Sequence, residues 1–408
     1  MFSGHYSYDA SNSTTETFIF NVVDYFNMAE SLGFERLSLS ERTSPSEIEV
    51  KNLTQPASVK FIADSNLMII MRGVPGTGKS TIVNYLMESL STDCLCSADN
   101  FFIRNGKYVF DKTQIKQAHT FCQQKAEKFC TEGHSVVIID NTNVMRWETD
   151  FYVDLAYKHG YVVVMITPLA QDTASPRTLA QRNKHNVSAD IIKVGYLLLL
   201  RKYFQAFQSI QPSYFAWFLS KRSAMKLMDI RDQGIRKVET ERYNGVYLDT
   251  PVLDSVVPRN TILHVTSKYL GQSKNANQLL QQLSTHIGSI GAIKVTSVVV
   301  TKRTIAARVC LDKASQEYYF NDMEGFSGNK PAVPRGLKEG FAAHITLGVA
   351  NGIEPKEARS DTIQSHFCEL QAAPLKDGPV HYYPDEELAI INLDKPTAFQ
   401  CIFAAAYR

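Results

Sequence analysis

The sequence contains the motif H-x-T twice, each time inside an apolar run that reads as a strand. The first copy is L-H-V-T at 263–266, and the second is A-H-I-T-L at 343–347. In an extended strand alternate side chains share a face, so each histidine and the threonine two residues later point to the same side. A single such histidine is usually a satisfied core residue, but a second copy argues against that interpretation. Each strand is therefore predicted to present reactive side chains on one face and core side chains on the other.

The elements that follow the two copies come in the same order. A helical pattern follows each histidine, and two strand-like runs follow each helix, so the order strand, helix, strand, strand is repeated. A duplicated unit of this kind predicts two lobes that face each other, with both histidines converging between them. The predicted elements are a helix with Leu279, Leu283 and Ile287 on one stripe and strands over 296–301 and 304–311, then a helix over 355–370 and strands over 388–393 and 397–407.

Two converging imidazoles and two hydroxyls suit phosphodiester hydrolysis without a metal. One neutral histidine takes a proton from water, and the other, protonated, gives a proton to the leaving alkoxide. Both forms are accessible because histidine titrates near ~6.5. Thr266 and Thr346 would donate hydrogen bonds to the non-bridging phosphoryl oxygens. No H-x-x-x-H or C-x-x-C motif occurs, so zinc is not predicted. The sequence does not separate base from acid, and the working assignment is His264 as acceptor and His344 as donor.

These strands resemble those of the two-histidine phosphoesterase superfamily. The longer strings at 262–268 and 334–348 are similar to the 2′,3′-cyclic nucleotide 3′-phosphodiesterase family, as are Y-F-A-W-F-L at 214–219 and I-F at 402–403. The resemblance extends over roughly residues 65 to 408. It implies hydrolysis of nucleoside 2′,3′-cyclic phosphates to 2′-phosphates, with no cofactor in this domain.

The resemblance also implies substrate contacts beyond the motif. Tyr214 and Tyr269 match aromatic positions that flank the nucleotide, and base stacking tolerates any base; the alternative is that both are half-buried core tyrosines. Pro355 matches a residue near the base, although a proline there also suits the start of the following helix.

One position departs from the family pattern. The family often has an arginine two positions before the second histidine, where this chain has Ala342. Arg335 or Lys338, in the longer loop before it, are the candidates to replace that charge. The departure bears on substrate affinity rather than on the chemistry.

The second motif lies nearer the N-terminus. The apolar run at 67–71 leads into G-V-P-G-T-G-K-S-T at 73–81, which fits G-x-x-x-x-G-K-[ST], and a helical pattern follows. Backbone N–H groups of such a loop wrap phosphate oxygens, the lysine reaches the β- and γ-phosphates, and the serine hydroxyl holds Mg²⁺. The predicted phosphate-binding residues are Gly76, Thr77, Gly78, Lys79, Ser80 and Thr81.

Three further residues suit phosphoryl transfer from ATP. Asp99 follows the first helix, where kinases of polynucleotide 5′-ends carry the base. Asp140 ends an apolar run and opens D-N-T-N, similar to the D-x-T-N string of those kinases, and would join Ser80 at Mg²⁺. The stretch 177–185 resembles their arginine-bearing lid, in which Arg182 would neutralise charge; a solvated helix face is the alternative.

Length and composition set the domain organisation. The chain has 408 residues, 44% of them hydrophobic, which is long for one domain. We predict an unassigned leader over 1–60 that includes an exposed linker at 38–49, a P-loop domain over 61–210, and a phosphoesterase domain over 211–408. The fold class is therefore α/β plus α+β: a parallel-sheet P-loop domain followed by a bilobed two-histidine domain.

Net charge, cysteine content and the two ends of the sequence predict the compartment and the partners of the protein. A net charge of +2 gives no global attraction to nucleic acid, so contact with RNA must be local. The odd number of cysteines, seven, suggests a reducing compartment. Neither a signal peptide, nor a run of ~18 apolar residues, nor a C-terminal prenylation box appears. A cytoplasmic monomer is predicted, with 2′,3′-cyclic nucleotides and RNA ends as partners.

Two rival functions stay open. In the first, both domains heal broken RNA, and the P-loop domain phosphorylates 5′-hydroxyl ends. In the second, the chain is a nucleotide- and RNA-binding scaffold whose hydrolase is vestigial, an interpretation that the complete set of two histidines and two threonines disfavours.

Overall fold

A computed structural model describes most of the chain from residue 45 onward. The described ranges are 45–168, 174–183, 187–195, 212–243, 262–270, 276–319, 335–375 and 378–407. Most of the predicted leader, residues 184–185 of the predicted lid and the boundary predicted near residue 210 lie outside them.

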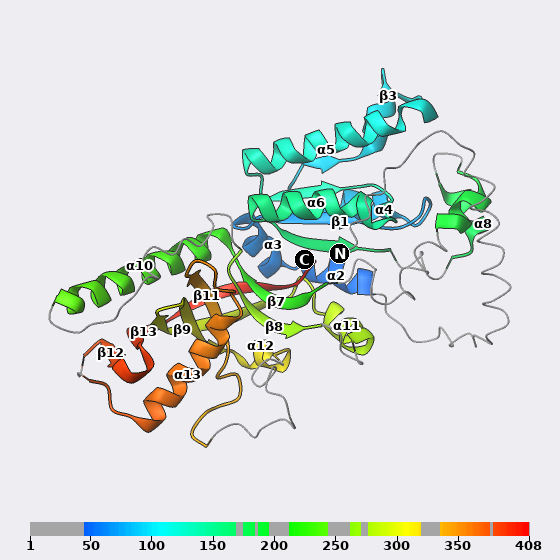
Figure 1. Ribbon diagram of the computed structural model, residues 1–408. Coiled ribbons are helices and arrows are strands. Elements are labelled where there is room, and N and C mark those ends of the chain that lie inside the picture. The colour runs from blue at the N-terminus through cyan, green and yellow to red at the C-terminus, as the bar shows by residue number, and fades with distance from the viewer. Residues whose placement is uncertain are drawn as a thin grey trace, which may run out of the picture. The chain divides into compact units, whose positions relative to one another are not determined.

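The first sheet is parallel, with strand order β2-β5-β1-β6. Every residue of β1, β5 and β6 is buried, because helices lie along the sheet (Figure 1). Strands buried on both faces read as continuous apolar runs, which is why the sequence identified β1 and β5. The elements are β1 Leu67–Met71, α4 Lys79–Ser89, β2 Leu95–Cys96, η1 Ala98–Phe102, β3 Ile103–Arg104, β4 Lys107–Tyr108, η2 Lys112–Gln114, α5 Ile115–Glu132, β5 Val136–Ile139, α6 Arg146–His159, β6 Val162–Ile166 and α8 Pro176–Arg182.

The second sheet is antiparallel, in the order β11-β10-β9-β13-β7-β8, with β12 paired to β13. The end strands β8 and β11 approach within 8 Å between Cα atoms, so the sheet curves until its two edges meet, nearly closing a barrel. The predicted fold class is confirmed. The elements are β7 Tyr214–Leu219, α10 Lys221–Tyr243, β8 His264–Tyr269, α11 Ala276–Ser284, β9 Ile290–Thr301, β10 Thr304–Leu311, α12 Lys313–Glu317, β11 His344–Val349, α13 Glu357–Gln371, β12 Val380–Tyr383, η4 Pro384–Glu386 and β13 Leu388–Ala406.

The last strand differs from the prediction. Two strands were expected, over 388–393 and 397–407, but β13 is one strand of 19 residues whose pairing with β9 shifts register between Asn392 and Thr397. The polar residues between them read as a turn but form an irregularity of the kind that bends a strand. Because β13 pairs with both β9 and β7, the two repeats share one sheet.

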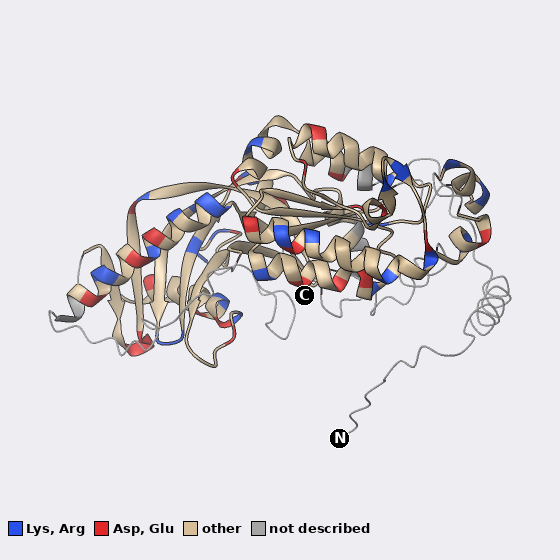
Figure 2. Cartoon of the chain, turned by 90° about the horizontal axis from the view of Figure 1, so that it is seen from above, with Lys and Arg blue, Asp and Glu red and all other residues tan. Residues whose placement is uncertain are grey.

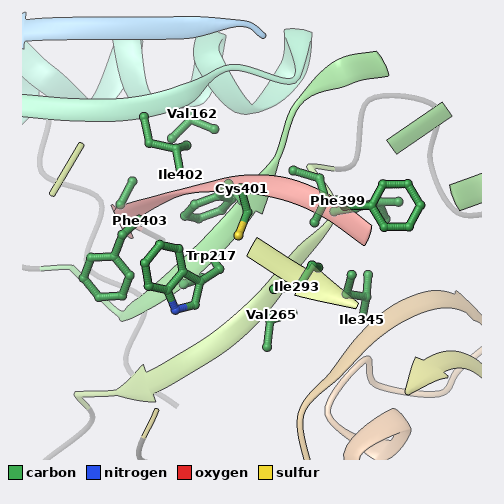
Figure 3. Close-up of a cluster of buried hydrophobic side chains, with 14 of the residues drawn as sticks. Val162, Trp217, Val265, Ile293, Ile345, Phe399, Cys401, Ile402 and Phe403 are labelled. Atoms are coloured by element: carbon green, nitrogen blue, oxygen red, sulfur yellow. The ribbon is translucent and has the colours of Figure 1, made fainter. Parts of the chain in front are cut away.

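Large side chains from β7 and β13 fill the core of this sheet (Figure 3). The rings of Trp217 and Phe403 lie 4.9 Å apart between centroids. A Cβ atom at Gly291 would come within 2.7 Å of the Trp217 ring, so only glycine fits there. Val162 of β6 belongs to the same cluster as Ile402.

The residues before β1 are more ordered than the sequence suggested. Of the exposed linker expected over 38–49, residues 45–49 form the start of helix α2, Pro45–Leu53, and residues 38–44 lie outside the described ranges. Helix α3 follows at Pro56–Ala63. Leu53 is fully buried. Asn52 Nδ2 donates to the carbonyls of Thr285 (3.2 Å) and Ile287 (3.0 Å). These contacts hold α2 against the chain segment that follows α11.

Charged residues are spread over the helices, with both signs interspersed (Figure 2). Within the described residues, no helix combines the length and the apolar character needed to cross a membrane. All seven cysteines are free thiols, six of them buried.

Helix α13 is fastened to the β9–β10 turn by one buried carboxylate. Asp361 accepts hydrogen bonds from Thr301 Oγ1 (2.9 Å), Thr304 Oγ1 (2.5 Å) and Arg303 Nε (2.8 Å). Its side chain is only 7% exposed. The helix that borders the second H-x-T strand is therefore fixed at this point.

Replacing Asp361 by alanine is expected to lower the free energy of unfolding by about 2–4 kcal/mol, because two buried hydroxyls and a guanidinium lose their acceptor. Urea denaturation measures the change. The matched control is Glu357→Ala, which removes a more exposed partner of Arg303 and should cost less than about 1 kcal/mol. Equal costs for the two variants would contradict this account.

Candidate active site

The first H-x-T strand presents its histidine and threonine on one face, as predicted. His264 and Thr266 are half-buried, whereas Val265 between them is fully buried. The Tyr214 ring stacks on the His264 imidazole, with centroids 5.2 Å apart and planes at 24°. Tyr269 lies 5.4 Å from Tyr214. The structure thus brings together four of the residues selected from the sequence.

The second strand repeats the pattern. His344 and Thr346 are half-buried, and Ile345 is fully buried. Thr346 Oγ1 donates to the carbonyl oxygen of Pro355 at 3.5 Å. Pro355 itself is exposed just before α13 begins. The second group of selected residues is therefore also gathered in one place.

Both imidazoles are held in the same way. The Nδ1 atom of His264 lies 2.9 Å from the carbonyl oxygen of Ile262, and Nδ1 of His344 lies 2.9 Å from that of Ala342. A carbonyl oxygen only accepts, so Nδ1 must carry a proton in each ring. In the neutral form the lone pair is then on Nε2 of both histidines, which fixes the atom that exchanges protons.

The two histidines are also electrostatically coupled. Burial lowers the pKa of His264. The pKa of His344 is lowered to about 4, chiefly by burial and also by positive charge on Arg359 and on His264, against a raising effect of the backbone hydrogen bond to Ala342. The two histidines lie on the edge strands β8 and β11, which approach each other. An anionic substrate there would raise both pKa values.

Arg359 is the cation that the sequence interpretation missed. It lies on α13, and its charge acts on His344. The two candidates named from the sequence, Arg335 and Lys338, are both exposed, and Ala342 is fully buried. The available signal was the spacing from Pro355, because residues four apart lie on the same side of a helix.

The P-loop has the geometry that its motif predicts. Gly76 and Gly78 have φ of 82° and 93°, and a Cβ atom at Gly76 would lie 2.1 Å from the carbonyl oxygen of Leu179 in α8. Lys79 begins α4, and its Nζ donates to the carbonyls of Gly73 (2.9 Å) and Val74 (3.1 Å). The glycines therefore let the loop turn before the lysine and let α8 pack against the loop. Of the other selected loop residues, Thr77 is buried, while Ser80 and Thr81 are exposed.

Two carboxylates converge on this lysine. Burial lowers the pKa of Lys79 to about 8, while the charges of Asp140 and Asp99 raise it. Ser80 Oγ donates to Asp140 Oδ2 at 3.0 Å, and Tyr108 OH donates to Asp99 Oδ1 at 3.1 Å. Arg182 is exposed in the last turn of α8.

A residue that the sequence did not single out positions Asp99. Asn141 Oδ1 accepts the backbone N–H of Ala98 at 2.9 Å, and its Nδ2 donates to Tyr152 OH at 3.4 Å. The start of η1 is thereby tied to the end of β5. The D-N-T-N string was the available signal, but its first residue alone was given a role.

Ser80 in α4 and Asp140 after β5 fit Mg²⁺. A hydroxyl and a carboxylate are hard oxygen ligands, and Mg²⁺ usually takes one or two of them together with substrate phosphates and water. Within the described ranges, His, Cys, Asp and Glu form no cluster of three or more that would hold a metal by itself. The Ser80–Asp140 pair is thus a site that would be completed by a nucleotide.

Comparison with known proteins places these two sites in families. The model of the 2′,3′-cyclic nucleotide 3′-phosphodiesterase family matches residues 253–407. The chain carries a domain of this phosphodiesterase family. An AAA domain model matches residues 68–202, which include the P-loop, so the N-terminal part carries a nucleotide-binding domain of that kind. The phosphodiesterase-family domain contains both H-x-T strands.

Two named relatives agree with the phosphodiesterase model. The chain is 25% identical over 349 residues to a mouse 2′,3′-cyclic-nucleotide 3′-phosphodiesterase, covering 81% of this chain and 79% of that protein. The rat protein of the same name is 24% identical, with the same coverage. The human NEDD4-binding protein 2 is 33% identical over 168 residues, which are 41% of this chain and 9% of that protein. A fungal RNA kinase crystal structure has 14% identity and a TM-score of 0.28, covering 84% of this chain and 99% of that one, which is too low to indicate a shared overall arrangement.

Proposed function

We propose that the chain hydrolyses nucleoside 2′,3′-cyclic phosphates to 2′-phosphates where β8 and β11 meet. One observation carries this proposal: two half-buried imidazoles from repeated strands, each with Nδ1–H held by a carbonyl, leave two Nε2 atoms available for proton exchange. The family of the domain and the printed names of its relatives support it.

The proposed reaction is an in-line displacement. One Nε2 accepts a proton from water as the water oxygen bonds to phosphorus, and the other Nε2, protonated, gives its proton to O3′ as the P–O3′ bond breaks. Thr266 and Thr346 donate to the non-bridging oxygens, on which charge develops. The phosphate stays on O2′. Tyr214 stacks on His264 and, with Tyr269, offers aromatic faces to the base.

The charges around His264 and His344 favour the reverse of the assignment made from the sequence, which took His264 as proton acceptor and His344 as donor. Burial lowers the pKa of both histidines, and positive charge on Arg359 and on His264 lowers that of His344 in addition. A lowered pKa keeps the lone pair on Nε2 available. We therefore take His344 as the base and His264 as the acid. A bound phosphodiester anion stabilises the protonated form of His264.

Replacing Arg359 by glutamine is expected to raise the KM for a cyclic nucleotide several-fold, because the anion loses an attracting charge. It should also raise the pKa of His344 above its value of about 4. Because the base must be neutral, kcat/KM would then begin to fall at a higher pH as the solution is acidified. The pH profile of kcat/KM measures this shift.

The control for this experiment is Lys356→Gln, which removes an exposed lysine paired with Glu354 at the same end of the helix. It should leave the profile unchanged, and Arg359→Lys should restore it in part. If the fall of kcat/KM at low pH began at the same pH in Arg359→Gln as in the wild type, the role assigned to this arginine would be refuted.

The direct test of the activity uses the purified chain with 2′,3′-cyclic mononucleotides in EDTA. The expected product carries phosphate on the 2′-oxygen, formed at an undiminished rate. A 3′-phosphate product would overturn the assignment of the broken bond. No turnover with any of the four bases would leave the scaffold as the better interpretation.

We propose further that the P-loop domain binds Mg²⁺ and ATP and transfers the γ-phosphoryl group to the 5′-hydroxyl of RNA. Asp99 would accept the hydroxyl proton, Lys79 would hold the transferred group and Arg182 would neutralise its charge. Mg²⁺, when bound at Ser80 and Asp140, would offset the charge of the phosphates. The supporting observation is the convergence of Asp140 and Asp99 on Lys79.

We propose that the chain works in the cytoplasm, because free, mostly buried thiols suit a reducing compartment. RNA ends that carry cyclic phosphates or 5′-hydroxyls are the macromolecular substrates that match both sites. We propose that the chain works as a monomer, which light scattering after size-exclusion chromatography would test.

A further inference from the structure

Figure 1 shows β3 of the β3–β4 hairpin near one end of α5. Exposed apolar side chains gather in the hairpin, in the residues that follow it and on α5, on which η1 packs. Side chains of this kind are normally buried, yet these are between 37% and 56% exposed in the part of the chain that the structure describes. A contiguous apolar patch on a soluble protein marks a binding surface. We call this group the hairpin surface, and it consists of Ile103, Tyr108, Val109, Phe110, Ile115 and Phe121.

The aromatic rings of the hairpin surface are held in place by one another. The Tyr108 and Phe110 rings are nearly parallel, at 12°, with centroids 6.5 Å apart. Phe110 also lies 5.1 Å from the ring of Phe102, which is buried. On the other side Phe121 lies 5.9 Å from Phe101. The exposed ring faces are therefore fixed on the core, which lowers the entropy lost when a ligand stacks on them.

The charge around these rings is positive. Residues 100–116 contain four basic side chains and one acidic one, Asp111. The Asp111 carboxylate already accepts from the backbone N–H (2.9 Å) and the hydroxyl (2.6 Å) of Thr113. Arg104 and Lys107, on the hairpin itself, are exposed. Aromatic faces next to basic side chains are the combination that holds single-stranded nucleic acid without reading its sequence.

One hydrogen bond joins the hairpin surface to the phosphoryl-transfer site. Tyr108 contributes its ring to the surface, and its hydroxyl donates to Asp99 Oδ1. The negative charge of Asp99 in turn raises the pKa of Lys79 in the P-loop. A strand lying over the rings would thus end beside the carboxylate.

We infer that the hairpin surface binds a single-stranded polynucleotide and presents its 5′-hydroxyl end to Asp99. The bases stack on Phe110 and its neighbours, and Arg104 and Lys107 contact phosphates. This inference rests on the proposed phosphoryl transfer, whose acceptor it identifies by chemistry and places on the fold.

The test separates binding from transfer. Binding of a labelled 5′-hydroxyl oligoribonucleotide is measured by fluorescence anisotropy in the full chain carrying His264→Ala and His344→Ala, so that the other site does not process the probe. Phe110→Ala should weaken binding by roughly five- to one-hundred-fold, and Phe110→Trp should restore it. Lys107→Ala should reduce the slope of log affinity against log salt by about 1.

The controls come from elsewhere on the surface. Met225→Ala removes an equally exposed apolar side chain on α10 and Lys221→Ala an exposed lysine, and both should bind as the parent does. ATP affinity should be unchanged in every variant.

The outcomes are distinguishable. Weaker binding in Phe110→Ala with no transfer by the wild type would support the surface and overturn the kinase proposal. Transfer with an unchanged KM for the oligonucleotide in Phe110→Ala would overturn the surface and leave the kinase. Unchanged oligonucleotide binding accompanied by loss of self-association would show that a second copy occupies the surface instead, which also refutes the inference.

Discussion

Replacing either His264 or His344 by alanine is expected to lower turnover of a 2′,3′-cyclic nucleotide by about 10²-fold or more. Each ring is held by the backbone carbonyl two residues earlier, just before its strand begins, so its removal deletes a proton carrier without removing a support of the fold. Turnover is measured with EDTA present, and circular dichroism checks that the variants fold. Thr266→Ala and Thr346→Ala should cost less, because each removes one donor to the phosphoryl oxygens.

A control histidine exists on the same sheet. His381 lies on β12, which pairs with β13 and not with the edge strands, so His381→Ala should keep near wild-type turnover. Near wild-type turnover in His264→Ala or His344→Ala would rule out the two-histidine mechanism. Loss of activity in His381→Ala alone would point to a different site.

Replacing Lys79 by alanine is expected to abolish phosphoryl transfer to a 5′-hydroxyl oligoribonucleotide, a loss of at least about 10²-fold. Its ammonium group donates to the carbonyls of Gly73 and Val74, and the charges of Asp140 and Asp99 act on it. Because its pKa is about 8, the charged form is present below pH 8 and is lost above it. ATP binding should weaken over the same range. Transfer is followed with γ-labelled ATP.

Asp99→Asn is the matched variant, because it keeps the shape of the side chain and removes the base. It should retain ATP binding while losing transfer, whereas Lys79→Ala should lose both. Cyclic phosphodiesterase activity should survive in each. ATP binding by the wild type without any transfer would reduce this domain to a nucleotide-binding module.

Local pattern identified most of the fold. The apolar runs of β1 and β5 and the run of β10 are strands because their periodicity and their flanking turns agree, and Gly76 and Gly78 adopt positive φ because the loop requires it. The pattern could not show which strands pair with each other. The residues between Asn392 and Thr397 look like a turn, and only pairing with β9 on both sides of them makes one strand of the two.

In the candidate site, too, the sequence predicted the residues of a local motif and missed those that act from other elements. His264, Thr266, His344 and Thr346 follow from a repeated motif, and their tautomers follow from the carbonyls that hold them. Arg359 acts on His344 through its charge, and Asn141 holds η1 through a hydrogen bond. The local signals for both, the spacing from Pro355 and the D-N-T-N string, do not show which residue each side chain meets in the fold, and the family pattern directed attention to Ala342 and its loop instead.

The position of β13 in the sheet sets the order in which this domain can fold during synthesis. It follows every other described strand of the sheet along the chain, yet it lies between β9 and β7, and without it the pair of β7 and β8 has no strand hydrogen-bonded to its β7 edge. During synthesis, β9 and β7 therefore keep open edges until residues 388–406 have left the ribosome. Such edges pair with other chains when they are exposed. Slow translation or early termination near residue 388 should therefore produce aggregation rather than a smaller folded domain.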